Sequence, residues 1–521
     1  MYKISILFDN REFEHDIYEL IRAFYPEAEI AVSYEEEDGA NTADLLFRVE
    51  KQEQSFIIRY QNESNTGVTS AEIIKGHSSD DAPLSCTEEK DAARQQRKEQ
   101  KDVLKYSLYK LLTKLTGKTL PWGNLTGIRP AKLAMAMIEA GMKNSEIAEE
   151  MRKRYLVSPE KTALAITIAN REREILKDID YENGYSLYVG IPFCPSICLY
   201  CSFSSYPLKQ WKDRVELYLD ALCKEIREVS SIMKKKGRKL DTVYIGGGTP
   251  TTLEPDQLQR LLDTLTEHFD CRNLAEFTIE AGRPDSITRE KLQVIRKYPV
   301  SRISVNPQTM NQETLEIIGR RHTAEETRQA FYLARECGFD NINMDLIAGL
   351  PGEHPEEMED TLRQIKELAP DSLTVHALAM KHGSRLTRER AASTEKQNYK
   401  QMARELEEMI DMARKAAGEM GLYPYYLYRQ KNIAGNFENV GYAKVDKAGI
   451  YNILIMEEKQ SIVAAGAGAS TKVVLPYEIP APGSKNGRMT NLIRIENVRD
   501  VGEYISRIDE MIERKGEWLW H

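Results

Sequence analysis

The chain lacks any long apolar run, and no window of its 521 residues approaches the roughly 20 apolar residues of a membrane-spanning helix. Its start, MYKISILFDNREFEHDIYEL, has no basic segment followed by an apolar stretch, so we expect no secretory signal. An excess of positive charge is also missing, because the formal net charge is −9. This balance argues against nucleic-acid binding through a basic surface. We expect a cytoplasmic protein that does not insert into membranes.

Cysteine is scarce, and its pattern excludes a disulfide framework because the 7 cysteines are odd in number and lie in a long chain. Three of them fall in the stretch YVGIPFCPSICLYCSF with the spacing Cys-x3-Cys-x2-Cys: Cys194, Cys198 and Cys201. No fourth cysteine lies close behind, whereas a structural zinc site usually has four ligands. The other cysteines are isolated, and we expect them to be buried small side chains: Cys86, Cys223, Cys271 and Cys337.

Three thiolates on one short loop can hold three irons of a [4Fe-4S] cluster and leave the fourth iron open to another ligand. That arrangement suits one-electron chemistry on S-adenosylmethionine (SAM). On the cysteines alone, three alternatives stay open: a zinc site, a redox pair of Cys198 and Cys201, or no cofactor.

The chain is too long for one ordinary domain, and its patterning predicts five segments. Residues 1–78 predict a small α/β domain and residues 79–100 a polar linker. Residues 101–182 carry helical spacing and predict a helical region. Residues 183–385 predict a βα-barrel core, and residues 386–521 a small C-terminal α/β accessory domain.

The barrel prediction rests on six short, nearly continuous apolar strands that alternate with helical patterns. The strands are SLYVGIPF, DTVYIGGG, EFTIEAG, RISVNPQ, NINMDLIAGL and SLTVHALA. One βα unit follows another without an obvious reversal, which favours a partial (βα)6 TIM-like barrel within an α/β protein. Periodicity alone does not separate this barrel from a doubly wound sheet.

Polar residues and glycines gather where the predicted strands end, and ligands of parallel βα-barrels bind at that end. Cys194 follows the first strand and the run Gly246–Pro250 follows the second. Glu280 ends the third strand, Gln308 the fourth and Asp345 the fifth. The glycines allow a ligand to approach the backbone, but the Walker lysine is missing, so we expect no nucleoside triphosphate.

Each of these features also has a structural interpretation. The glycine run could form only a tight βα turn. Glu280 could pair with Arg283 or with a helix N-terminus. Asp345 is flanked by apolar residues and needs a partner, which is a ligand or an arginine. The basic run Arg320–His322 is a solvated face or a helix cap, or it recognises carboxylates.

From Tyr188 to about Ala379 the chain resembles the oxygen-independent coproporphyrinogen III oxidase group of radical SAM proteins, most of all the HemZ-type coproporphyrinogen dehydrogenase branch. The motifs that carry the resemblance are YVGIPFCPSICLYC, GGGTPT, EAGRPD, RISVNPQTMN, IGRRHT and NINMDLIAGLP. The resemblance implies oxidative decarboxylation of coproporphyrinogen III propionates to vinyl groups, giving protoporphyrinogen IX in heme biosynthesis. It also implies a reduced electron donor of the flavodoxin or ferredoxin type.

The resemblance further implies which residues form the site. Cys194, Cys198 and Cys201 would hold the [4Fe-4S] cluster, with one or two SAM molecules beside it. Tyr188 would lie near the SAM sulfonium as a catalytic residue. The residues that would contact SAM are Tyr188, Tyr200, Gly247, Gly248, Thr249, Glu280, Gln308, Arg320, Asp345, Ile347 and Ala379.

Two departures from the family pattern bear on the substrate. The well-characterised enzymes have a fourth cysteine where this chain has Phe203, and a histidine where it has Gly190. The heme-chaperone branch of the family also lacks that cysteine. The alternative to a porphyrinogen-oxidising enzyme is therefore a heme-binding or heme-trafficking protein that uses the same barrel.

Overall fold

The computed structural model describes residues 2–34, 43–52, 55–62, 65–72, 86–127, 129–203, 205–379, 381, 383–392, 399–430, 437–484 and 489–519. The chain divides into two compact units, which are described in turn. The first comprises Met1–Thr167, Gln397–Ala403 and Arg429–Phe437. The second comprises Ile168–Lys396, Arg404–Tyr428 and Glu438–His521. No described helix is long and apolar enough to cross a membrane.

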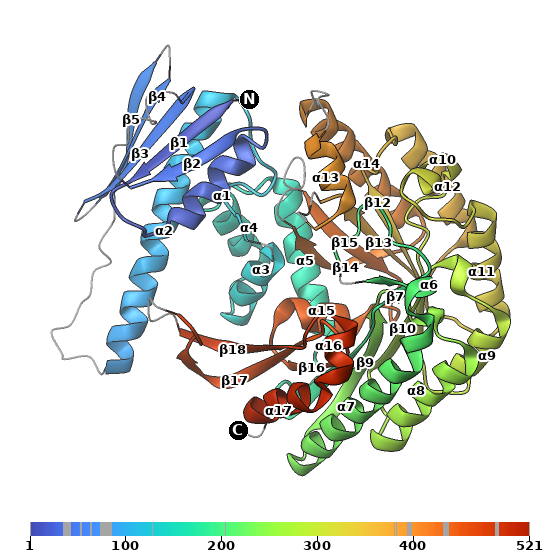
Figure 1. Cartoon of the computed structure of the whole chain (residues 1–521). Coiled ribbons are helices and arrows are strands. Elements are labelled where there is room, and N and C mark those ends of the chain that lie inside the picture. The colour runs from blue at the N-terminus through green and yellow to red at the C-terminus, as the bar shows by residue number, and fades with distance from the viewer. Residues whose placement is uncertain are drawn as a thin grey trace. The chain divides into compact units, whose positions relative to one another are not determined.

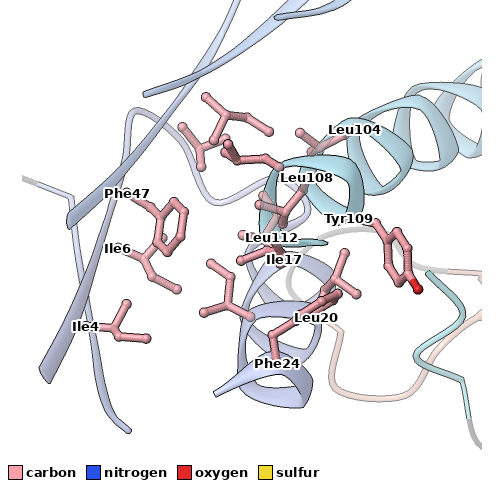
Figure 2. Close-up of a cluster of buried hydrophobic side chains, with 14 of the residues drawn as sticks. Ile4, Ile6, Ile17, Leu20, Phe24, Phe47, Leu104, Leu108, Tyr109 and Leu112 are labelled. Atoms are coloured by element: carbon pink, nitrogen blue, oxygen red, sulfur yellow. The ribbon is translucent and has the colours of Figure 1, made fainter. Parts of the chain in front are cut away.

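The first unit is built on a five-stranded mixed sheet in the order β2-β1-β3-β4-β5. Its elements are β1 (Lys3–Phe8), α1 (Glu14–Phe24), β2 (Glu29–Ser33), β3 (Leu45–Lys51), β4 (Ser55–Asn62), β5 (Thr66–Glu72), α2 (Cys86–Thr116), α3 (Pro130–Glu139) and α4 (Asn144–Lys153). Alternate residues of β1, Ile4 and Ile6, are buried against Leu20 of α1 and Leu108 of α2 (Figure 2). The apolar faces of strand β1 and of helices α1 and α2 therefore pack together in one core.

Helix α2 occupies part of the predicted linker. Residues 79–85 lie outside the described residues, but the chain is helical from Cys86 onward. The charged stretch EEKDAARQQRKEQ is rich in strong helix formers, so a polar composition does not prevent a helix here. Apart from this helix in the predicted linker, the bounds of the five predicted segments remain predictions.

The second unit contains the predicted barrel (Figure 1). Its parallel strands are β6 (Gly184–Ile191), β9 (Lys239–Gly247), β10 (Glu276–Gly282), β11 (Arg302–Val305), β12 (Ile342–Ala348) and β13 (Ser372–Ala377). They are hydrogen-bonded in chain order without a reversal, which confirms the partial barrel over the doubly wound sheet. The helices on its outer side include α7 (Val215–Lys235), α8 (Pro255–His268), α9 (Arg289–Arg296), α10 (Gln312–Ile317), α11 (Ala324–Glu336) and α12 (Pro355–Leu368) (Figure 1).

The C-terminal strands extend the same sheet. β15 (Glu438–Ala443) pairs antiparallel with β13, and β16 (Ser461–Ala465) pairs parallel with β6. Further elements of this unit include α13 (Arg385–Ala392), α14 (Tyr399–Glu419), β14 (Tyr423–Arg429), α15 (Ile450–Glu457), β17 (Ser470–Pro480), β18 (Met489–Glu496), α16 (Val501–Ser506) and α17 (Ile508–Leu519), with α5 (Pro159–Ile175) preceding β6. Strands β14 and β18 are the two edges of this sheet, so the described barrel is open.

The sequence predicted nearly continuous apolar strands, but the barrel strands alternate between apolar and polar side chains. In β10, Phe277 and Ile279 are fully buried on one face, while Glu276, Thr278 and Glu280 lie on the other. The polar face points inward, because Arg302 of β11 reaches past β12 to donate a hydrogen bond to Ser372 Oγ of β13 (2.9 Å). Five inward side chains lie between buried neighbours and are themselves partly exposed: Tyr188, Tyr244, Glu280, Asp345 and His376. The barrel interior is therefore polar and accessible at this level.

A buried ion pair fixes the C-terminal segment to the barrel. Lys515 of α17 pairs with Glu225 of α7, and both side chains are at most 1% exposed. Glu225 also accepts hydrogen bonds from Asn497 Nδ2 (2.9 Å), Tyr504 OH (2.5 Å) and the backbone N–H of Gly466 (2.8 Å). The charge is thus satisfied on all sides, as a buried carboxylate requires.

We expect Lys515→Met to lower the free energy of unfolding by about 3–5 kcal/mol, because it leaves the Glu225 charge buried without its partner. The matched control is Lys224→Met, which removes an exposed ion pair with Asp509 between the same two helices and should cost at most about 1 kcal/mol. Chemical denaturation of the variants checks this. Equal losses from the two substitutions would contradict it.

Candidate functional site

The three-cysteine loop begins where the first barrel strand ends. Cys194 closes the short strand β7 (Phe193–Cys194), which pairs with β8 (Tyr206–Pro207). The loop between them is fastened by backbone hydrogen bonds from Leu199 N to Ile318 O (2.9 Å) and from Leu386 N to Leu199 O (3.0 Å). The thiols of Cys194, Cys198 and Cys201 are all free. The loop is thus held at the carboxyl end of the barrel with its sulfurs available to a ligand.

Burial keeps two of these thiols protonated in the protein alone. It raises the pKa of Cys194 to about 11, although a hydrogen bond from Thr249 Oγ1 to its sulfur (3.6 Å) opposes the rise. Burial also raises the pKa of Cys201, against a contact with Ser205 Oγ (3.8 Å). Metal binding requires the thiolate, so positive metal ions would have to displace these protons.

Three cysteine thiolates on one loop are a donor set that suits a [4Fe-4S] cluster. Among the described residues, no three His, Cys, Asp or Glu side chains gather closely enough to hold one metal ion. In a [4Fe-4S] cluster each thiolate binds a different iron, so the sulfurs stand further apart. Of the cysteines outside the loop, Cys223 and Cys271 are buried as expected and Cys337 is partly exposed. The side chain of Cys86 lies outside the described residues.

The glycine run lies directly against the cysteine segment. Gly248 N donates to Ile191 O (2.7 Å) and Thr249 N donates to Phe193 O (2.8 Å). A Cβ on Gly248 would lie 2.6 Å from Phe193 O and 3.0 Å from the sulfur of Cys194. The run therefore continues β9 through Gly247 and turns only after it, and it brings bare backbone to the cysteines. Gly247, at φ +107°, lies beside the hydroxyl of Tyr188.

We expect Gly248→Ala to displace the cysteine loop and to lower the iron content after anaerobic reconstitution, because the methyl group overlaps Phe193 O and approaches Cys194. Gly418→Ala is the control, since nothing lies within 4 Å of the Cβ that it adds. Iron and sulfide analysis per chain measures the effect. Full cluster content in the Gly248 variant would show that the close contact is not needed.

Glu280 binds a tyrosine rather than Arg283. The hydroxyl of Tyr244 donates a hydrogen bond to Glu280 Oε1. The ring of Tyr244 stacks on Tyr451 at 4.5 Å between centroids, and Tyr188 stacks on both at 6.3 Å. A Cβ on Gly246 would lie 2.8 Å from the ring of Tyr244 and 3.2 Å from Glu280 Oε2, so the glycine lets both side chains pack against the backbone. In the described part of the chain nothing donates a hydrogen bond to Glu280 Oε2, so this oxygen could accept one from a ligand.

Burial raises the pKa of Glu280 from 4.5 to about 7, against the effect of the Tyr244 hydrogen bond. The folded protein therefore holds a proton here that the unfolded chain releases. Between about pH 4.5 and 7 we expect wild-type stability to fall, relative to Glu280→Gln, as the pH rises. Above pH 7 the difference between the two should become constant.

Denaturation of wild type and Glu280→Gln at several pH values measures this difference directly. Glu356→Gln is the control, because Glu356 is an exposed carboxylate in the first turn of α12. A difference between wild type and Glu280→Gln that does not change from pH 4.5 to 7 would contradict the assignment.

The protein neighbours of Asp345 are an asparagine and a histidine, and whether a ligand also binds it stays a prediction. Asn343 Nδ2 donates to Asp345 Oδ1 (2.7 Å), and His376 Nε2 lies 4.0 Å from Asp345 Oδ2. His376 Nδ1 in turn lies 3.2 Å from the hydroxyl of Tyr428. Burial lowers the pKa of His376, which favours the neutral ring, while Asp345 opposes this. Neither His376 nor Tyr428 was among the site residues predicted from the sequence. The alternation of Ser372, Thr374 and His376 on the inward face of β13 was the signal that could have identified His376.

The chain after β11 is strained and carries an unsatisfied polar atom. Gln308 has φ +70°, which is rare outside glycine, and it is held by backbone bonds from its N–H to Asp345 O and from Ile347 N–H to its own carbonyl (both 2.9 Å). Its buried Oε1 has no hydrogen-bond partner within the described part of the chain. Strain of this kind is often stored at ligand sites.

The run Arg320–His322 is not a solvated face, because only Arg321 is exposed. The guanidinium of Arg320 donates to the backbone carbonyls of Asn306 and Pro307. Tyr200 packs against an apolar cluster that contains Ile347.

The structure brings the predicted site residues together in three groups. Cys194 lies with Gly247, Gly248 and Thr249; Tyr188 lies with Glu280 through Tyr244; Gln308 lies with Asp345 and Ile347. Ala379 is buried two residues after β13, and no contact with the other predicted site residues is established for it.

The chain is similar to several known proteins. A model of the radical SAM superfamily matches residues 188–365. The oxygen-independent coproporphyrinogen-III oxidase-like protein HemZ of Bacillus subtilis (strain 168) is 40% identical over 425 residues, 81% of this chain and 81% of that protein. The heme chaperone HemW of the same organism is 38% identical over 194 residues, 37% of this chain and 50% of that protein. The solved structure of coproporphyrinogen III oxidase (HemN) from Escherichia coli matches with a TM-score of 0.48 and 23% identity, over 66% of this chain and 72% of that one.

Proposed function

The chain belongs to the oxygen-independent coproporphyrinogen-III oxidase-like family of radical SAM proteins, and we propose that it converts propionates of coproporphyrinogen III to vinyl groups by oxidative decarboxylation, giving protoporphyrinogen IX. The observation that carries the proposal is the polar inward face of the barrel, accessible at Tyr188, Glu280 and Asp345 beside the three-cysteine loop. Such a face suits a large polar ligand, whereas a closed apolar core does not.

In this proposal Cys194, Cys198 and Cys201 hold a [4Fe-4S] cluster that, together with SAM, supplies one-electron radical chemistry when bound. The chain positions and encloses these groups. The backbone of Gly247 and Gly248 offers a close approach beside Cys194, where any side chain would collide. Tyr188 lies next to that backbone, so its ring would flank a ligand bound between them.

Other residues offer polar contacts that nothing in the described protein satisfies. Glu280 Oε1 accepts from Tyr244, which leaves Glu280 Oε2 as an acceptor for a ligand. Gln308 Oε1 and Ser304 Oγ are buried without a hydrogen-bond partner among the described residues. Unsatisfied buried polar atoms are costly, and a SAM molecule or ordered water would remove that cost. A second SAM would lie where Gln308, Asp345, Ile347 and Arg320 gather.

The tetrapyrrole would enter over the exposed side of the cysteine loop. Phe203 is 71% exposed, and Lys381 Nζ lies 5.3 Å above its ring. An exposed aromatic ring with a cation beside it suits a ligand that has both an apolar body and carboxylate groups. The electron would come from a reduced protein of the flavodoxin or ferredoxin type.

The second candidate function is heme binding without porphyrinogen oxidation. Phe203 favours it, because the fourth cysteine of the well-characterised enzymes is missing at this position in this chain.

We expect the anaerobically reconstituted protein, given SAM, a reductant and coproporphyrinogen III, to form protoporphyrinogen IX and 5′-deoxyadenosine. Cys198→Ala should lose the [4Fe-4S] absorbance and both products, while Cys337→Ala, outside the loop, should keep them. Product analysis by liquid chromatography distinguishes the outcomes. Deoxyadenosine without a vinyl product would refute the oxidation, and tight heme binding without turnover would establish the second candidate.

A further inference from the structure

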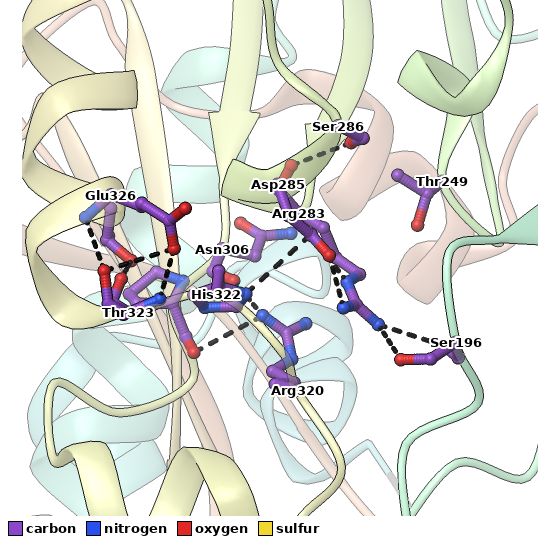
Figure 3. Close-up of polar contacts among 12 residues, drawn as sticks. Ser196, Thr249, Arg283, Asp285, Ser286, Asn306, Arg320, His322, Thr323 and Glu326 are labelled. Carbon is purple, nitrogen blue, oxygen red and sulfur yellow. Dashed lines mark hydrogen bonds and ion pairs between the residues drawn. The ribbon is translucent and has the colours of Figure 1, made fainter.

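Arg283 links the end of β10 to the cysteine loop (Figure 3). Its side chain is 3% exposed. One terminal nitrogen donates to Ser196 O (3.0 Å) and to Ser196 Oγ (2.7 Å). The other terminal nitrogen and Nε donate to the two carboxylate oxygens of Asp285 (2.7 and 2.9 Å). The guanidinium is therefore held by four hydrogen bonds between the loop and its own turn.

This contact holds the cysteine loop itself, because Ser196 lies between Cys194 and Cys198. Ser196 Oγ in turn donates a hydrogen bond to the backbone carbonyl of Gly319 (2.9 Å). Behind the pair, Asp285 Oδ1 lies 3.8 Å from the fully buried ring of His322. A rigid planar fork such as arginine fixes both the distance and the orientation of what it binds, which a lysine does not.

The positively charged side chain of Arg283 is hydrogen-bonded to Ser196, two residues after Cys194 in the cysteine loop. The same charge would favour any added negative charge on the loop, such as the electron that a cluster accepts on reduction. Asp285 offsets part of this effect, so the net influence is moderate.

We propose that Arg283 is a positioning residue that preorganises the cysteine loop for cluster binding and raises the reduction potential of the cluster. The proposal rests on the cluster part of the proposed function and not on the tetrapyrrole.

The chain contains a matched control in Arg272. Arg272 makes the same two-residue fork to Asp270, with Nε–Oδ1 and NH2–Oδ2 distances of 2.8 Å, but its side chain is 85% exposed. Within the described part of the chain its hydrogen bonds go to Asp270. Arg272→Gln therefore removes a similar fork to an aspartate two residues away without touching the proposed site.

The experiment compares Arg283→Gln, Arg283→Lys and Arg272→Gln after anaerobic reconstitution. Iron release to a chelator measures how firmly the loop holds the cluster, and a redox titration followed by EPR measures the midpoint potential. We expect Arg283→Gln to release iron about 10- to 100-fold faster than wild type and to have a lower potential. Arg283→Lys should keep the potential but release iron faster, and Arg272→Gln should match wild type in both.

Wild-type iron release and potential in Arg283→Gln would overturn the proposal. If Arg283→Gln fails to fold, Arg283→Lys decides: wild-type iron release in that variant would also overturn it. A merely structural role would change thermal stability without moving the potential. No tetrapyrrole is needed, so the result stands whether or not the wild-type protein forms protoporphyrinogen IX.

Discussion

The parallel pairing of β6 with β9 is the constraint on which the rest of the site depends. Along this pair Gly190 lies opposite Gly246 and Ile191 opposite Gly247. The two chains stay in contact beyond the strands, through bonds from Gly248 and Thr249 to the cysteine segment. Because this contact involves backbone on both sides, it fixes where Cys194 leaves the barrel. The same pairing sets Tyr188 beside Tyr244, and Tyr244 in turn holds Glu280.

The barrel accepts a polar interior because its outer face supplies the apolar core. Residues such as Val243 and Phe277 are buried towards the helices, while their strand neighbours carry hydroxyl, amide and charged groups inward. Most of these inward groups find partners in one another, as Arg302 does with Ser372. Two exceptions, Asn306 Oδ1 and Gln308 Oε1, lie just after β11, at the carboxyl end of that strand. A ligand bound at this end of the barrel could satisfy them.

The sequence predicted which site residues lie at strand ends, but it did not predict their partners from other strands. The strand-end positions of Cys194, Glu280 and Asp345 follow from short patterns, so they could be read along the chain. The partners of these residues could not, because Tyr244 and His376 come from other strands and depend on the inward register. Arg320 and Arg321 are adjacent arginines with opposite burial, which only the packing around α10 decides. The helical part of the predicted linker shows that a charged composition alone does not determine local structure.

The central claim is that three cysteines hold a cluster and leave one iron open to SAM. The most direct measurement is the EPR spectrum of the reconstituted and reduced protein, recorded with and without SAM. The account predicts a [4Fe-4S] signal whose g-values shift when SAM is added, because SAM binds the open iron. A cluster signal that SAM leaves unchanged would contradict the account, since it would mean that the fourth iron is closed or out of reach.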